Sequence, residues 1–162
     1  MKLISFDDVI DENGQPDAEW IVVAFSRIEH AVCANTMLQL LQDFPGRRFE
    51  AQIGKAPEMV RALHKALRGA KSGRGEAAAG IRRHRLSAKQ RRDANIVRVS
   101  ENSILLEISK QAFQTLAELV RDGATRLDEE YATIVGVSPA EGAEIAAEMD
   151  AILRALSASR SL

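Results

Sequence analysis

Residues 95–109 read NIVRVSENSILLEIS, and this stretch decides the fold. Val97 and Val99 alternate with polar residues, and Glu101-Asn102 is typical of a tight turn. The return strand has an apolar residue at every second position, namely Ile104, Leu106 and Ile108. Strands joined this closely pair antiparallel, because parallel strands need a crossover of about a dozen residues or more. The stretch therefore predicts an antiparallel hairpin.

The chain before this hairpin predicts a second pair of strands and a helix. Residues 2–10 and 19–25 are rich in β-forming residues, and the Asn13-Gly14 pair between them supplies the positive φ angles of a turn. Ser26-Arg27-Ile28-Glu29 has the spacing of a capping box, in which the Ser and Glu side chains satisfy free backbone amides. A helix is therefore predicted from there to about Asp43.

Four further helices follow from caps and apolar stripes, after an irregular stretch at residues 47–49. The first opens at Pro57, with an apolar stripe of Met59, Val60, Leu63 and Leu67 and an opposite face of Arg61, Lys65 and Arg68. The second is capped by Ser109 and ends at Asp122-Gly123, where glycine suits a left-handed C-terminal position. The others cover 126–135, opened by Thr125, and 139–157, opened by Ser138-Pro139-Ala140-Glu141 with a serine cap and a glutamate at the third helical position. Hairpins and grouped helices favour the α+β class over a parallel sheet. The prediction is two small β-hairpins or a small antiparallel sheet packed against four to five helices, with a mostly helical C-terminal third.

Length and composition fit a single compact α+β domain over residues 1–162, because 46% hydrophobic and 28% charged residues are typical of a soluble globular chain. Cys33 has no second cysteine to pair with, and the acidic start lacks the apolar run of a signal peptide, so a cytoplasmic location is expected. The longest apolar run, residues 20–25, is far shorter than the roughly 20 residues of a membrane span, so no membrane partner is expected. Sixteen arginines against six lysines favour a GC-rich bacterial or phage genome.

The formal net charge of −1 combines three unequal blocks. Residues 1–45 have two cations and eight acids, and residues 93–162 have six cations and twelve acids, a net charge of −6 in each block. Residues 46–92 have fourteen Lys and Arg against three acids, a net charge of +11. This asymmetry predicts a surface for an anionic partner or for self-pairing.

The densest cations lie in residues 72–93, predicted to be a basic flexible arm inserted within the domain because Ser72-Gly73-Arg74-Gly75 is glycine-rich. Arginine suits phosphate, because its planar fork binds two oxygens and each neutralised phosphate releases counterions. Residues 50–112 contain no aromatic side chain to stack on a base, so contact with the backbone of a duplex or structured RNA is favoured over reading of bases. The cations expected to make the contacts are Arg68, Lys71, Arg74, Arg82, Arg83, Arg85, Lys89, Arg91 and Arg92, and those that extend the field are Arg61 and Lys65.

Residues 132–138 resemble the centre of a helix-turn-helix motif, in which a small residue, Ala132, stands four positions before Gly136 and Val137-Ser138 starts the second helix. The resemblance implies that the next helix would read DNA. The acids of that helix are Glu141, Glu144, Glu148 and Asp150. Phosphates would repel such a helix, and Gly142 stands where the motif has a buried apolar residue. We therefore expect the stretch to form a packed helix pair.

No catalytic residue, metal site or cofactor is predicted. His30 and Cys33 lie three apart on one predicted helix, but a zinc site needs three or four ligands, and the other histidines lie in unrelated segments. The chain has no Gly-x-Ser-x-Gly elbow, no phosphate-binding Gly-Lys-Ser/Thr loop and no His-Glu-x-x-His helix. The protein is therefore not expected to be an enzyme.

The sequence predicts a small non-catalytic intracellular binding protein whose basic central segment contacts an anionic partner, with the phosphate backbone of nucleic acid favoured. Two alternatives stay open. One is a protein-interaction module, such as an adaptor, inhibitor or immunity-type protein, that docks an oppositely charged protein surface. The other is a homo-oligomer whose charge blocks complement one another.

Overall fold

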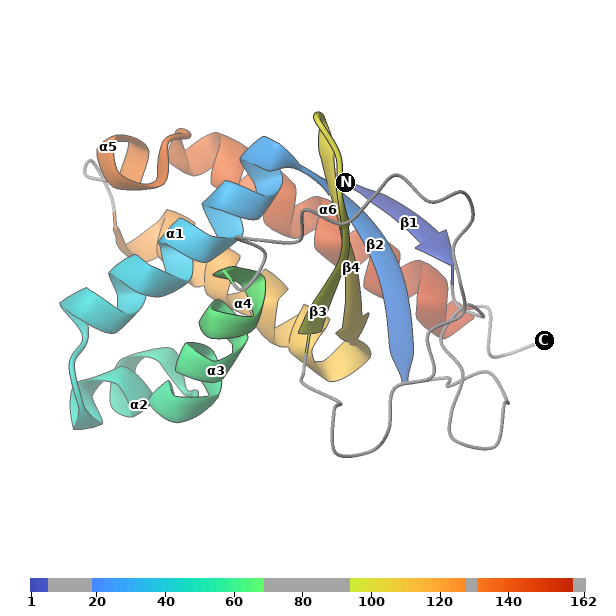
Figure 1. Cartoon of the computed structure of the whole chain (residues 1–162). Helices are drawn as coiled ribbons and strands as arrows, with labels where there is room; N and C mark the ends of the chain where they lie inside the picture. Colours follow the sequence, from blue (N-terminus) through green and yellow to red (C-terminus); the bar gives the residue numbers. More distant parts are fainter. Residues whose placement is uncertain (6–18, 69–93, 128–130, 159–162) are drawn as a thin grey trace.

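The computed structural model describes residues 1–5, 19–68, 94–127 and 131–158 (Figure 1). Its elements in chain order are β1 (Lys2–Ser5), β2 (Trp20–Ser26), α1 (Arg27–Asp43), α2 (Arg47–Ile53), α3 (Pro57–Arg68), β3 (Ala94–Val99), β4 (Ser103–Ser109), α4 (Lys110–Arg126), α5 (Tyr131–Val135) and α6 (Pro139–Ala158). The α+β class is confirmed, with six described helices where four to five were predicted. Figure 1 shows α1, α3 and α4 beside the sheet and α6 passing behind it.

The strands form one antiparallel sheet in the order β1-β2-β4-β3. The predicted hairpin of β3 and β4 is confirmed, with Val99 opposite Ile104, and β1 pairs with β2 as predicted for the N-terminal strands. The two pairs join through the central strands β2 and β4, where Val23 lies opposite Leu106. The sheet is therefore continuous rather than two separate hairpins.

One face of the sheet supplies the main core. Its buried side chains come from alternate positions of the two central strands: Ile21, Val23, Phe25, Ile104, Leu106 and Ile108. The helices bury their apolar residues in the same core, and the ring of Phe25 meets that of Phe113 in α4 edge to face, with the centroids 6.3 Å apart. The opposite face carries a smaller cluster of Trp20 and Val22 with Leu105. The predicted alternation along β4 is thus confirmed.

Each central strand ends in a serine that caps the next helix. Ser26 ends β2, and its hydroxyl accepts a hydrogen bond from the Glu29 amide at 3.1 Å, while the Glu29 carboxylate accepts one from the Ser26 amide at 2.6 Å. Ser109 ends β4, and its hydroxyl accepts from the Ala112 amide at 3.1 Å. Both predicted caps are confirmed, and both helices that they open, α1 and α4, have 17 residues.

Glu29 also connects the N-terminus to the helices. Its carboxylate forms an ion pair with the Met1 amine, which also donates to Glu148 of α6 at 2.9 Å. Burial by itself raises the pKa of Glu29, but the hydrogen bonds from the Met1 amine and from Ser26 outweigh it, so this pKa lies below its ordinary value. The charged form of Glu29 therefore stabilises the folded protein.

We expect Glu29→Gln to lower the free energy of unfolding by about 1 kcal/mol at neutral pH, because glutamine keeps the capping geometry and loses the charge. A group whose pKa falls on folding contributes stability above its unfolded pKa, here the ordinary value of 4.5, and that contribution is lost as the pH falls through the folded value. Urea unfolding across the acid range measures the difference between the two proteins, which should narrow below pH 4.5. A difference that does not change with pH would contradict the charge argument.

Residues 47–49, expected to be irregular, instead begin α2. The helix follows Gly46, whose φ is 61°, and ends before Gly54, whose φ is 71°. Phe49 and Ile53 lie four residues apart, on one side of the helix, and both are buried in the core. Burial of this pair favours a short helix that local propensity alone would not maintain.

The end predicted for a helix at Asp122-Gly123 is wrong, because α4 continues to Arg126. Thr125, expected to open the next helix, lies inside α4 and donates its hydroxyl hydrogen to the Arg121 carbonyl at 2.9 Å. Gly123 is the place where α4 approaches α1: a Cβ atom there would lie 2.2 Å from Cγ2 of Thr36. The glycine therefore serves close helix packing rather than a left-handed C-terminal position.

The C-terminal helices agree with prediction more closely. α6 matches the helix expected over 139–157, and its start has the predicted cap: the Glu141 carboxylate accepts from the Ser138 amide at 2.8 Å, and the Ser138 hydroxyl accepts from the Glu141 amide at 3.2 Å. α5 is only the second half of the helix expected over 126–135, and residues 128–130 are not among those described.

Two predicted features, the turn at Asn13-Gly14 and the basic arm at 72–93, lie outside the described residues. Within the part of the chain that the structure describes, no helix is both long and apolar enough to cross a bilayer.

Candidate surface for an anionic partner

α3 carries a row of cations along its exposed side. Arg61, Lys65 and Arg68 are exposed, and His64 between them is half-buried. Their spacing of three and four residues places all four on one side of the helix, and at 1.5 Å per residue they span about 10 Å. We call these four residues the α3 row. The side chains that attach α3 to the core are Val60, Leu63 and Leu67.

The α3 row has little acidic compensation. The Arg61 guanidinium lies 3.6 Å from the Glu58 carboxylate, but both side chains are exposed, and such pairs contribute little. Among the described residues, Lys65 and Arg68 form no ion pair. The first two residues of α2 are also exposed arginines, so residues 46–68 have six cations against two acids. This part of the surface therefore has an excess of positive charge.

Arg68 is the one predicted contact residue that the structure describes, and it is the last residue of α3. The other eight lie outside the described residues: Lys71, Arg74, Arg82, Arg83, Arg85, Lys89, Arg91 and Arg92. The structure therefore does not bring the nine together. It places the α3 row directly before the segment of the chain that contains the other eight.

A histidine of α1 contacts the end of α3. Nε2 of His30 lies 3.1 Å from the carbonyl oxygen of Leu67, to which it donates in the tautomer protonated at Nε2. Burial lowers the pKa of His30 more than this carbonyl raises it. The pKa of His64 is also lowered, first by burial and then by Arg68. Neither histidine was predicted to belong to the anion-binding surface, although the spacing of His64 from Arg61 and Arg68 places the three on one side of a helix.

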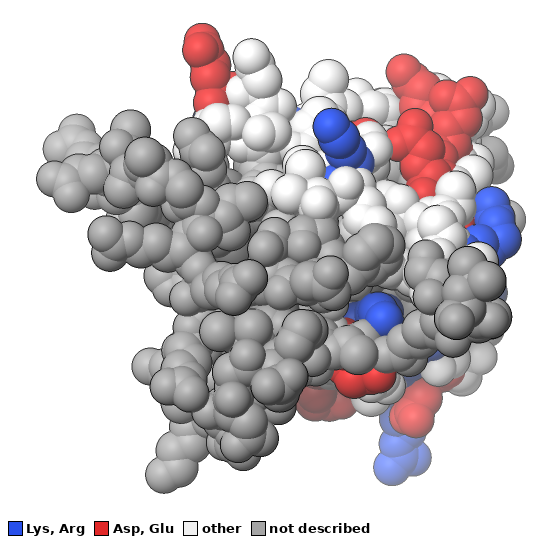
Figure 2. Space-filling model, turned by 90° about the vertical axis from the view of Figure 1, so that its right-hand side faces the viewer, with Lys and Arg blue, Asp and Glu red and all other residues white. Residues whose placement is uncertain are grey.

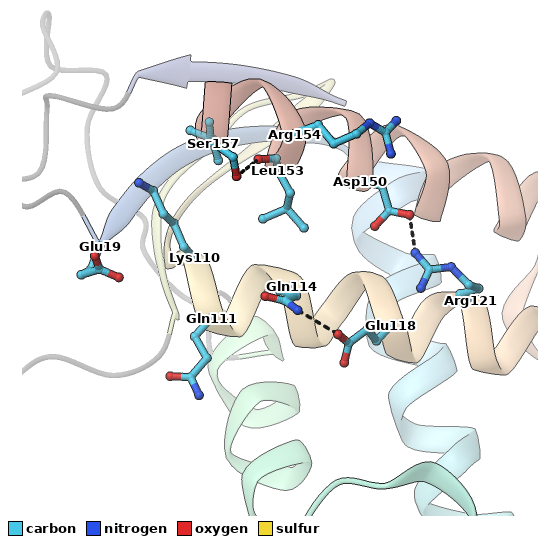
Figure 3. Close-up of a pocket in the computed structure, with 11 residues that line it drawn as sticks. Glu19, Lys110, Gln111, Gln114, Glu118, Arg121, Asp150, Leu153, Arg154 and Ser157 are labelled. Carbon is cyan, nitrogen blue, oxygen red and sulfur yellow. Dashed lines mark hydrogen bonds and ion pairs between the residues drawn. The ribbon is translucent and has the colours of Figure 1, made fainter. Parts of the chain in front are cut away.

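A groove of about 630 Å³ lies between α4 and α6. Figure 3 shows Leu153 pointing into it. Its charged side chains have both signs: Glu19, Lys110, Glu118, Arg121, Asp150 and Arg154. Arg121 and Asp150 form an ion pair across the groove. None of the nine predicted contact residues is among the described residues that line this groove.

Glu118 shows how these charges are balanced. It forms an ion pair with Lys55, and its carboxylate accepts a hydrogen bond from the Gln114 amide at 3.1 Å. Burial raises the pKa of Glu118, but the bonds from Lys55 and Gln114 outweigh it, so this pKa lies below its ordinary value. A groove of balanced, paired charges does not favour a polyanion, and the α3 row remains the better candidate surface.

The stretch that resembles a helix-turn-helix is explained by packing. Tyr131 of α5 is fully buried, and its hydroxyl lies 3.2 Å from Oγ1 of Thr36 in α1. A Cβ atom at Gly142 of α6 would lie 2.5 Å from the same tyrosine oxygen. Glycine thus stands where the motif has an apolar residue because the tyrosine side chain needs the space.

His30 and Cys33, which lie three residues apart on α1, each contact other parts of the fold. The histidine contacts the Leu67 carbonyl, and the thiol is fully buried in the core. Within residues 1–5, 19–68, 94–127 and 131–158, no group of three or more His, Cys, Asp or Glu could hold a metal ion.

Cys33 gives a direct test of the core. Burial raises the pKa of its thiol well above the ordinary value, and the thiolate is the reactive form. We expect a disulfide reagent to label the native protein at least about 1000-fold more slowly than the urea-unfolded chain, since labelling must wait for opening of a core with a stability of several kcal/mol. The release of chromophore over time measures both rates. Equal rates would contradict the packing of α1 against the sheet.

The side of the molecule shown in Figure 2 displays acidic and basic side chains together among the described residues.

No protein family model, curated protein or solved structure matches the chain.

Proposed function

We propose that this is a small non-catalytic protein that binds the phosphate backbone of nucleic acid through its basic central segment, residues 68–92, together with the α3 row. The observation that carries the proposal is the net charge of +11 over residues 46–92. Within these residues, α3 presents exposed cations that have few acidic neighbours. The contact residues proposed for the central segment are the nine predicted from the sequence. Arg68 belongs both to these nine and to the α3 row.

Phosphate is the anion that best fits this pattern. The α3 row spans about 10 Å, which is long enough for its cations to reach neighbouring phosphates of one strand of a duplex. Arginine binds phosphate with two donors at once, and most cations of the segment are arginines. Because residues 50–112 lack aromatic side chains, stacking on single-stranded bases is not part of the proposal.

The test is binding of a labelled DNA duplex and of a structured RNA hairpin over a salt series from about 50 to 200 mM. The proposal expects the logarithm of the binding constant to fall linearly with the logarithm of salt concentration, with little dependence on base sequence. Weak binding with no salt dependence would overturn it.

An acidic protein surface is the second candidate partner. Charge complementarity of this kind steers association between proteins, and α6 shows that the chain itself presents exposed acids, Glu141, Glu144 and Glu148, on a helix surface. A stoichiometric protein partner that resists nuclease treatment would favour this function, that of an adaptor, inhibitor or immunity-type protein. A mass in solution above that of one chain, reduced when residues 72–93 are deleted, would favour self-association instead.

A further inference from the structure

We infer that His64 is a proton-dependent member of the α3 row, so that the protein binds its anionic partner more tightly as the pH falls. The inference rests on the proposed function, because it concerns how the same surface is regulated. It goes beyond that function by assigning a role to a residue that a count of lysines and arginines leaves out.

The position of His64 carries the inference. It follows Arg61 by three residues and precedes Arg68 by four, so an anion held by the two guanidiniums lies beside the imidazole ring. The ring is half-buried, and Arg68 is the charged group that acts on it. In the free protein burial and Arg68 both disfavour the imidazolium, whereas a bound phosphate would favour it.

α3 packs mainly against α1 and β3. Its residues Met59 and Leu63 also line a small pocket with Ser109 and with Gln111, Ala112 and Thr115 of α4, none of which has an acidic or basic side chain. In the turn of α1 that reaches Leu67, the ionisable residues are Glu29, His30 and Cys33. Glu29 is held by Ser26 and the Met1 amine, His30 contacts the Leu67 carbonyl, and Cys33 is buried. The one ionisable residue in β3 is Arg98. The one acid among these residues, Glu29, is bonded to Ser26 and the Met1 amine, and within the described part of the chain it forms no ion pair with His64. The partner's phosphates are therefore the anions expected to stabilise the charge of His64.

The direction of the effect follows from linkage. When an anion raises the pKa of His64 on binding, the histidine takes up a proton. Binding therefore strengthens as the pH falls through the pKa of the complex, and it levels off below the lower pKa of the free protein. A rise of half a unit to one unit corresponds to about three- to tenfold tighter binding. The phosphodiesters of a duplex do not titrate in this range, so the proton must come to the protein.

The experiment measures the affinity of the whole protein for a short DNA duplex at pH 8.0 and pH 5.5, at constant ionic strength and with a label that is insensitive to pH. The wild type is compared with His64→Gln, His30→Gln and His84→Gln, which exchange each histidine in turn for a neutral residue. We expect about three- to tenfold tighter binding at the lower pH for the wild type and for His30→Gln, and a clearly smaller change for His64→Gln. Calorimetry in two buffers of different ionisation enthalpy should show proton uptake by the wild type that His64→Gln reduces.

The outcomes separate this inference from the proposed function. Binding that has the expected salt dependence but the same affinity at both pH values overturns the role of His64 and leaves the proposed function standing. A pH effect that survives in His64→Gln and disappears in His84→Gln also overturns it, and assigns the proton to the central segment. No binding to the duplex at either pH overturns both.

Discussion

Gly123→Ala is expected to lower the free energy of unfolding by about 2 kcal/mol, although alanine is the better helix former. In an open helix this substitution would stabilise the protein by about 1 kcal/mol. Here the added Cβ would lie 2.2 Å from Cγ2 of Thr36, which is fully buried and bonded through its hydroxyl to Tyr131. Thr36 has a stiff β-branched side chain, so relief requires α1 and α4 to separate or the hydroxyl to leave its partner. Urea denaturation of the two proteins measures the loss.

A second substitution tests whether this contact is the cause. Thr36→Ser removes the methyl group in question and keeps the hydroxyl that faces Tyr131. We expect the double variant to be more stable than Gly123→Ala by about 1 kcal/mol or more, and Thr36→Ser alone to lose about 1 kcal/mol through the missing methyl group. Additive effects in this cycle would mean that Gly123 and Thr36 do not meet.

Replacing Arg82, Arg83 and Arg85 together by glutamine is expected to weaken duplex binding by about two orders of magnitude near 0.1 M salt. If each arginine neutralises one phosphate, three counterion contacts are lost, and the slope of the salt dependence should decrease by about 2.7. Titration of the labelled duplex over the salt series gives both quantities.

A matched control separates this local effect from net charge. Lys2, Arg126 and Arg154 are exposed cations outside residues 46–92, and replacing these three by glutamine changes the net charge by the same amount. We expect the control to keep most of the affinity and nearly the whole salt slope. Equal losses in the two triple variants would mean that only the total charge matters, and would remove the basic segment from the proposed function.

Local signals explain most of what could be predicted about the fold. The caps at Ser26, Ser109 and Ser138 depend on residues three positions away, and the hairpin of β3 and β4 depends on a short turn, so each could be read from a few neighbouring residues. The pairing of β2 with β4 depends on residues far apart in the chain and left no local mark, so separate hairpins and one sheet could not be distinguished.

The errors have the opposite origin, since tertiary contacts overrode local preference. Gly123 looks like a helix end, but it lies inside α4 because Thr36 needs the space. α2 is short and lacks a side-chain cap, and the burial of Phe49 and Ile53 explains it. For the candidate surface, the exposed cations of α3 were predicted correctly as the face opposite the core, whereas His64 was left out although its spacing from Arg61 and Arg68 places it on the same face.

The two capping serines, Ser26 and Ser109, stand at corresponding places in a repeated order of strands and helices. Within the described residues, each half of the chain has the same order of elements: two strands, a helix of 17 residues, a short helix, and a helix that begins with proline. Ser109 follows Ser26 by 83 residues, and the buried residues of α1 have buried counterparts at that distance in α4. These residues are Val32, Cys33, Ala34, Thr36, Met37 and Leu40, and their counterparts are Thr115, Leu116, Ala117, Leu119, Val120 and Gly123.

Val23 and Leu106 are also 83 residues apart and lie opposite each other in the sheet, so the two halves meet at the pairing of β2 with β4. α1 and α4 bury residues at corresponding positions, whereas α3 presents cations where α6, its counterpart, presents alanines and acids. The basic α3 and the acidic α6 therefore occupy corresponding places in the two halves.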